Sequence, residues 1–154
     1  MILYQYDMKN LLSIVINCKN DNYHKNFISR LETSLNLNLS FLENIGERNK
    51  IKFIIVDWGS EIPLSDEIKI YSKFNESVDF YNVSKNITTH ISEKYPGNFN
   101  VEISGNLGFR KSNSEFILYT GSDQIFSKSG WLNLINLLEK KSKSSYDLFE
   151  TIFY

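Results

Sequence analysis

The sequence predicts an α/β domain in which a mostly parallel sheet is flanked by helices. Two observations favour this fold: short apolar runs rich in β-branched residues alternate with stretches of helical periodicity, and three of these runs end in polar, turn-forming clusters. The chain has 154 residues, of which 42% are hydrophobic and 14% aromatic, and this is ample for one packed core. We therefore expect a single domain over residues 1–154.

The first half of the chain is predicted to fold as strand, helix, strand. Residues 12–17 form a continuous β-branched run, as expected of a strand buried on both faces. Apolar residues at 23–42 recur at three- and four-residue spacing, which predicts an amphipathic helix that ends at Gly46. A break in this helix is allowed where Asn and Leu alternate. A second strand at 52–56 runs into the turn residues 57–60.

The second half adds two strands and two helices to this pattern. Strands are predicted at 78–83 and 116–119, with a helix from about Gly105 to Ser114 between them. Hydroxyl groups at 127–129 offer N-caps for a last helix whose apolar face spans 131–138. Alternating strands and helices imply a doubly wound sheet, which binds ligands at the carboxyl ends of its strands.

Composition excludes several classes of function. The formal net charge is −1, so the chain lacks the basic field that nucleic-acid binding requires. Cys18 is the only cysteine, and no Cys/His cluster has zinc-ligand spacing, which fits a reducing, cytoplasmic location. The apolar run at 11–16 is too short to span a bilayer and lacks a signal-peptide cleavage site, so we expect no transmembrane segment.

Asp123 is the candidate metal ligand. It follows the strand at 116–119, where a carboxylate can share Mn²⁺ or Mg²⁺ with a diphosphate. The alternative is a turn or capping aspartate, although Ser127 and Ser129 are better placed to cap the next helix.

The ends of the first two strands carry further candidates for donor binding. Asp57 could accept a hydrogen bond from a nucleobase or ribose, with Trp58 as an aromatic surface beside it. A turn aspartate next to a core tryptophan is an equally good interpretation. Asn17 and Cys18 could present backbone groups to a ligand, with an ordinary loop as the alternative.

A glycine-rich basic stretch at 105–111 is the candidate pyrophosphate contact. Its glycines permit close backbone approach, and Asn106 and Arg110 are the residues that we expect to face the ligand. The alternative is a basic, exposed helix face. We expect Asp57, Asn106, Arg110 and Asp123 to converge on one site at the carboxyl edge of the sheet.

Four blocks of the chain, 12–22, 53–58, 105–111 and 115–127, resemble GT-A-type glycosyltransferase-like proteins related to family 2, which are often found in polysaccharide biosynthesis. The resemblance implies a single GT-A-like, Rossmann-like domain that binds a nucleoside diphosphate sugar. It places the nucleotide base at Asp57 and the metal and diphosphate at Asp123. Gly121 stands where the family's Asp-x-Asp motif has its first aspartate, and Trp58 replaces the second aspartate of the usual Asp-Asp-Gly-Ser pattern.

The chain is shorter than members of that family, so the resemblance implies a truncated domain. Family members continue into a part that binds the acceptor and supplies the catalytic base, and Asp147 and Glu150 lie too early to be equated with it. No catalytic residue is therefore assigned. We expect metal-dependent transfer of a sugar to a glycan or other acceptor. The alternatives are a non-catalytic donor-binding or interaction domain and a nucleotidyltransferase, although the chain lacks the basic Gly-rich loop of the latter.

Overall fold

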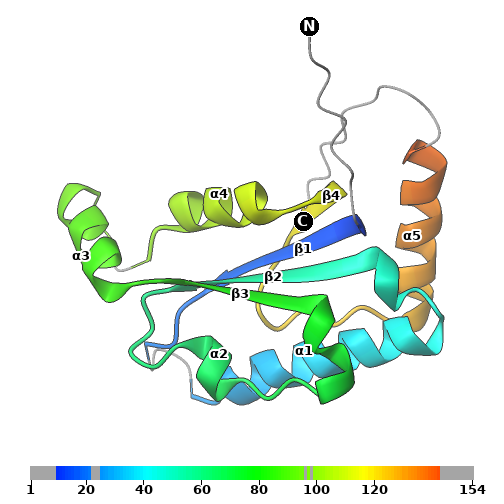
Figure 1. The fold of residues 1–154 in the computed structure, drawn as a ribbon, viewed down its shortest axis with the longest axis horizontal. Helices are drawn as coiled ribbons and strands as arrows, with labels where there is room; N and C mark the ends of the chain where they lie inside the picture. The colour runs from blue at the N-terminus through cyan, green and yellow to red at the C-terminus, as the bar shows by residue number, and fades with distance from the viewer. Residues whose placement is uncertain (1–9, 22–24, 96, 98, 143–154) are drawn as a thin grey trace, which may run out of the picture.

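An all-parallel sheet organises the described part of the chain (Figure 1). In this computed structural model, which describes residues 10–21, 25–95, 97 and 99–142, the strand order is β3-β2-β1-β4 and every neighbouring pair is parallel. The predicted α/β class and the parallel sheet are thereby confirmed, and the four carboxyl ends lie at one edge. The strands are β1 (Asn10–Cys18), β2 (Ile51–Trp58), β3 (Val78–Val83) and β4 (Ser114–Tyr119).

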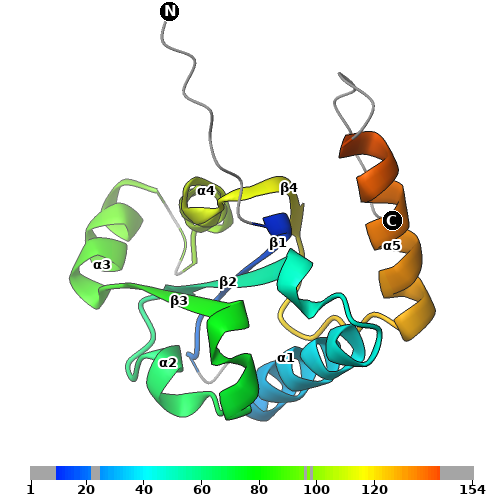
Figure 2. The same ribbon diagram turned by 45° about the vertical axis from the view of Figure 1, so that its right-hand side comes forward.

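Helices cover both faces of the sheet (Figures 1 and 2). One face carries α1 (Phe27–Asn44), the short α2 (Leu64–Glu67) and α5 (Lys128–Ser142), and the opposite face carries α3 (Lys85–Lys94) and α4 (Val101–Lys111). Two 3₁₀ turns, η1 (Arg48–Lys50) and η2 (Ser72–Ser77), precede β2 and β3. None of the described helices combines the length and the apolar character needed to cross a bilayer.

The larger core lies between the sheet and α1. Leu31, Leu35, Leu39 and Leu42 are fully buried there, and their spacing is the helical periodicity seen in the sequence. The allowed break does not occur, because α1 continues to Asn44. Gly46 adopts a φ of 77°, which confirms that it ends the helix in a left-handed turn.

The helix predicted at 105–114 lies at Val101–Lys111, because the Asn100 side chain caps it and β4 begins at Ser114. The Asn100 side chain accepts a hydrogen bond from the backbone N–H of Ile103 at 2.9 Å. The last helix begins as predicted, with the Ser127 hydroxyl accepting from the backbone N–H of Gly130 at 3.0 Å. Helices α2 and α3 were not expected from the sequence, because α2 has only four residues and α3 has few apolar residues and buries only Thr88.

Candidate functional site

A cavity of about 450 Å³ opens at the carboxyl edge of the sheet, and we call it the Asp123 cavity. The loop after β1, the first turn of α1 and the loop after β4 form its walls. Its volume lies in the range of small-molecule sites. The lining residues are Asn17, Cys18, Lys19, Asn20, Asp21, Phe27, Arg30, Phe99, Gly121, Ser122 and Asp123.

Arg30 and Asp123 form an ion pair across this cavity. Nη1 of Arg30 and Oδ2 of Asp123 lie 3.3 Å apart, and the two side chains are 43% and 47% exposed. Arg30 is the fourth residue of α1, where the helix dipole disfavours a cation and an anion nearby offsets that cost. Arg30 was not expected from the sequence. A basic residue in the first turn of the helix that follows β1 was the signal available.

The loop that carries Asp123 is fastened to α1 by Asn38. The amide oxygen of Asn38 accepts hydrogen bonds from the backbone N–H of Phe126 at 3.0 Å and from Nε1 of Trp131 at 3.2 Å. Its Nδ2 donates to the carbonyl oxygen of Gln124 at 2.8 Å, and the Ser34 hydroxyl donates to the same oxygen. In the sequence, the signal for this anchor was Ser34 and Asn38, two polar residues four positions apart on the buried face of α1.

Asn17 and Cys18, the candidates at the end of β1, line the cavity. Asn17 holds neighbouring elements together: its Nδ2 donates to Val101 O at 3.1 Å and to Ser104 Oγ at 2.6 Å, and its amide oxygen accepts from the Tyr119 hydroxyl. Burial, with the Asp57 carboxylate as a lesser cause, raises the pKa of the Cys18 thiol far above its usual range. Cys18 is therefore a neutral thiol in the cavity wall.

Asp57 and Trp58 lie at the carboxyl edge but do not line the Asp123 cavity. Asp57 is 2% exposed, and its two oxygens accept from Ser60 N at 3.1 Å, Leu64 N at 2.9 Å and Asn82 Nδ2 at 3.3 Å. Trp58 is buried beside Val83 in the smaller core. This geometry matches the alternative interpretation of a turn aspartate and a core tryptophan.

The structural role of Asp57 predicts a loss of stability without any ligand. We expect Asp57→Asn to lower the free energy of unfolding by about 1 kcal/mol, because an amide N–H₂ replaces an oxygen that accepts hydrogen bonds. Urea denaturation measures this change. Asp66→Asn is the control, because Asp66 is an exposed aspartate of the adjacent α2 and should change stability by less than about 0.5 kcal/mol. Equal stability of wild type and Asp57→Asn would contradict the structural assignment.

Asn106 and Arg110 do not reach the Asp123 cavity, so the expected convergence of four residues does not occur. The first turn of α4 contacts Asn17, whereas Lys111, at its other end, lines a cavity with Asn10 at the start of β1. At about 1.5 Å per residue, Arg110 lies roughly 14 Å along the helix from Val101. The glycines of this block serve packing against the sheet: a Cβ at Gly108 would lie 2.3 Å from Cγ1 of Val15. The exposed, basic helix face was therefore the better interpretation.

The fold of this chain resembles that of a solved structure. The chain is similar to S. aureus TarS 1-349, a glycosyltransferase, with a TM-score of 0.54 and 14% sequence identity over 84% of this chain. The fold is glycosyltransferase-like. The chain spans 32% of the TarS chain, and at this identity the likeness concerns the fold alone. No protein-family model matches the sequence, and no curated protein matches it at a significant level.

A divalent metal fits the Asp123 cavity only together with a ligand. Within the described ranges, no three His, Cys, Asp or Glu side chains converge as a metal site. Asp21 and Asp123 both line the Asp123 cavity. Mg²⁺ commonly combines one or two carboxylates with water and substrate phosphates. The residues present therefore suit a metal that arrives with a diphosphate.

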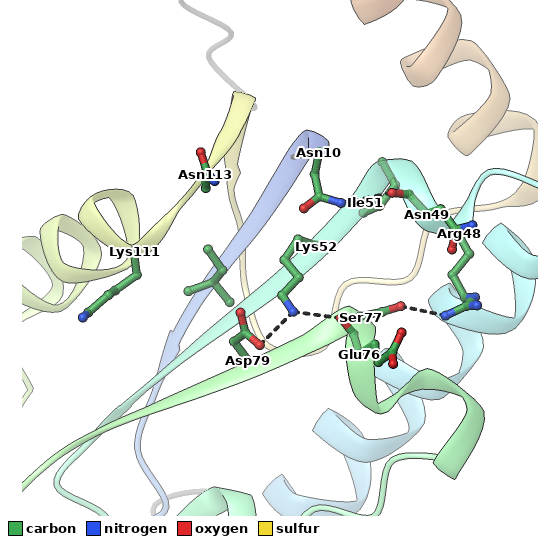
Figure 3. Close-up of a pocket in the computed structure, with 11 residues that line it drawn as sticks. Asn10, Arg48, Asn49, Ile51, Lys52, Glu76, Ser77, Asp79, Lys111 and Asn113 are labelled. Carbon is green, nitrogen blue, oxygen red and sulfur yellow. Dashed lines mark hydrogen bonds and ion pairs between the residues drawn. The ribbon is translucent and has the colours of Figure 1, made fainter. Parts of the chain in front are cut away.

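A cavity of about 620 Å³ lies at the opposite edge of the sheet (Figure 3). Three of its charged side chains have partners in the cavity: Lys52 Nζ lies 2.7 Å from Asp79 Oδ1, and Arg48 donates to the Ser77 hydroxyl at 3.1 Å. Because doubly wound sheets bind ligands at the carboxyl ends of their strands, the smaller Asp123 cavity is the candidate site.

Proposed function

We propose that the Asp123 cavity binds the diphosphate of a nucleoside diphosphate sugar and that the chain is the donor-binding part of a glycosyltransferase. The observation that carries the proposal is the Arg30–Asp123 pair at the carboxyl edge of a glycosyltransferase-like sheet. Such a pair offers a cation for phosphate oxygens and a carboxylate for a metal in one cavity. Lys19 and Asp21 line the same cavity and add one charge of each sign.

Each side chain has a separate task in this proposal. Arg30 donates charge-assisted hydrogen bonds to the diphosphate, for which its planar fork of donors is suited. Asp123 would hold Mn²⁺ or Mg²⁺. When bound, the metal offsets the negative charge that develops on the leaving diphosphate. Helix α1 begins at Phe27 in the cavity wall, and the positive end of its dipole there favours the diphosphate.

A non-catalytic donor-binding domain is the second candidate. It needs the Arg30–Asp123 pair for donor binding but no catalytic base, and no residue of the Asp123 cavity is assigned as one. Donor hydrolysis separates the two candidates: release of free sugar from a bound donor indicates an enzyme, and binding without turnover indicates a binding domain.

The proposal predicts that Asp123→Ala removes the metal dependence of donor binding. Calorimetric titration of UDP-, GDP- and dTDP-sugars should show one donor that wild type binds at least about tenfold more tightly with Mn²⁺, a gain of about 1.4 kcal/mol. Asp123→Ala should bind that donor equally with and without Mn²⁺, because its carboxylate is the proposed anchor of the metal. Arg30→Gln should weaken binding under both conditions, because it removes the charge on the diphosphate.

The control is Asp79→Ala, which also removes an aspartate from a partly exposed ion pair, but outside the Asp123 cavity. This variant should keep the full metal effect. Asp123→Ala should stay within about 0.5 kcal/mol of wild-type stability, as exposed ion pairs contribute little. Failure of every donor to bind wild type, or a full metal effect in Asp123→Ala, overturns the proposal.

A further inference from the structure

A second cavity of about 570 Å³ adjoins the Asp123 cavity on the side of β4. Asn17 and Gly121 line both cavities, so one short wall separates them. We call it the Tyr119 cavity. Gly121 contributes no side chain to the shared wall, and ligands in the two cavities would approach each other most closely there.

The linings of the two cavities differ in charge. Cations and carboxylates line the Asp123 cavity, as expected of a site for a metal and a diphosphate. Among the described residues, no charged side chain lines the Tyr119 cavity. Its polar side chains are those of Asn17, Tyr119, Thr120 and Gln124, of which Asn17 and Tyr119 are hydrogen-bonded to each other, and the ring of Phe126 adds an apolar surface. Neutral hydrogen-bonding groups beside aromatic rings suit an uncharged ligand rich in hydroxyls.

The Tyr119 ring is held in place before any ligand binds. Its hydroxyl donates to Asn17, and its ring meets Phe109 edge to face at 5.7 Å. Burial and nearby Glu102 raise the pKa of Tyr119 against the opposing effect of the Asn17 hydrogen bond, so the hydroxyl stays protonated at neutral pH. The residue is nevertheless 38% exposed. A fixed, partly exposed aromatic side chain provides binding surface at little entropic cost.

We propose that the Tyr119 cavity binds a neutral saccharide, the acceptor for the donor held in the Asp123 cavity. This inference rests on the proposed function, since an acceptor site requires a sugar donor bound next to it. In the transfer, the bond between the anomeric carbon and the diphosphate oxygen breaks, the acceptor oxygen bonds to that carbon, and the acceptor hydroxyl loses its proton to solvent. The shared wall at Gly121 is where the two reacting atoms meet.

Amide and side-chain chemical shifts of the ¹⁵N-labelled chain test the inference. Maltose, cellobiose and diacetylchitobiose are the probes, titrated to millimolar concentrations. We expect at least one of them to shift the backbone amides of Thr120 and Gly121 and the side-chain amide of Gln124, without shifting Arg30. Tyr119→Leu and Gln124→Ala should each weaken that binding by about tenfold.

Tyr95→Leu is the control, because Tyr95 is an exposed tyrosine outside both cavities, and it should bind the probes like wild type. Gln124→Ala keeps the backbone carbonyl that Asn38 and Ser34 bind, so it tests the cavity if Tyr119→Leu fails to fold. A donor that binds beside Arg30 while no probe shifts Thr120 or Gln124 overturns the acceptor cavity but leaves the proposed function standing. Saccharide binding with no donor binding overturns the proposed function and with it the acceptor role.

Discussion

Asn38→Ala is expected to lower the free energy of unfolding by about 3 kcal/mol, because it leaves one buried and one partly buried donor without an acceptor at roughly 1–3 kcal/mol each. These donors are the backbone N–H of Phe126 and Nε1 of Trp131. The variant also removes the bond from Nδ2 to the carbonyl oxygen of Gln124. The segment that follows Asp123 would then be held to α1 chiefly by the Ser34 hydroxyl.

Urea denaturation measures the loss of stability, and hydrogen exchange shows where it acts. The Phe126 amide should exchange faster in Asn38→Ala by more than the global loss of stability explains, because its acceptor is gone. Asn36→Ala is a matched control on the same helix: Asn36 is also buried, but it accepts from Tyr71 N and donates to Lys69 O. That variant should expose the Tyr71 amide and leave Phe126 protected. Normal protection of Phe126 in Asn38→Ala would contradict the anchoring role.

The elements that the sequence predicted are those whose signal is local. Apolar runs at 12–17 and 52–56 lie within β1 and β2, and leucines at helical spacing occupy the buried face of α1. Hydrophobic periodicity reports burial, and burial determines the element. The parallel sheet was predicted as well, because strands that alternate with helices favour parallel pairing.

The candidate site was predicted less completely because it depends on pairs that are distant in sequence. Asp123 was selected from its place after β4, but its partner Arg30 lies on α1, and no local pattern joins the two. Asp57 has the same sequence signature as a ligand and as a turn residue, and only its burial and its hydrogen bonds favour the turn. Sequence patterns locate strand ends well, but they do not show which side chains point into a cavity there.

The glycines of α4 show the same limit of prediction from sequence. Substitutions at these glycines also give the second large effect on stability that we expect. Gly105 and Gly108 look alike in sequence, and both are buried on the helix. A Cβ atom added at each of these two glycines would meet different neighbouring atoms. At Gly105 the nearest atom is Cε2 of Tyr119 at 3.6 Å, an ordinary contact, whereas at Gly108 it is Cγ1 of Val15 at 2.3 Å. Val15 is fully buried in β1 and its β-branched side chain is stiff, so α4 itself must move.

We therefore expect the two alanine variants to change stability in opposite directions. Gly108→Ala should lower the free energy of unfolding by about 2 kcal/mol, since the cost of overpacking exceeds the gain in helix propensity. Gly105→Ala should raise it by about 0.5–1 kcal/mol, because alanine restricts the unfolded chain and fits the native contact. Paired urea denaturation curves measure both changes. If Gly108→Ala is as stable as Gly105→Ala, then α4 does not lie this close to β1, and the packing role assigned to the glycine-rich block is wrong.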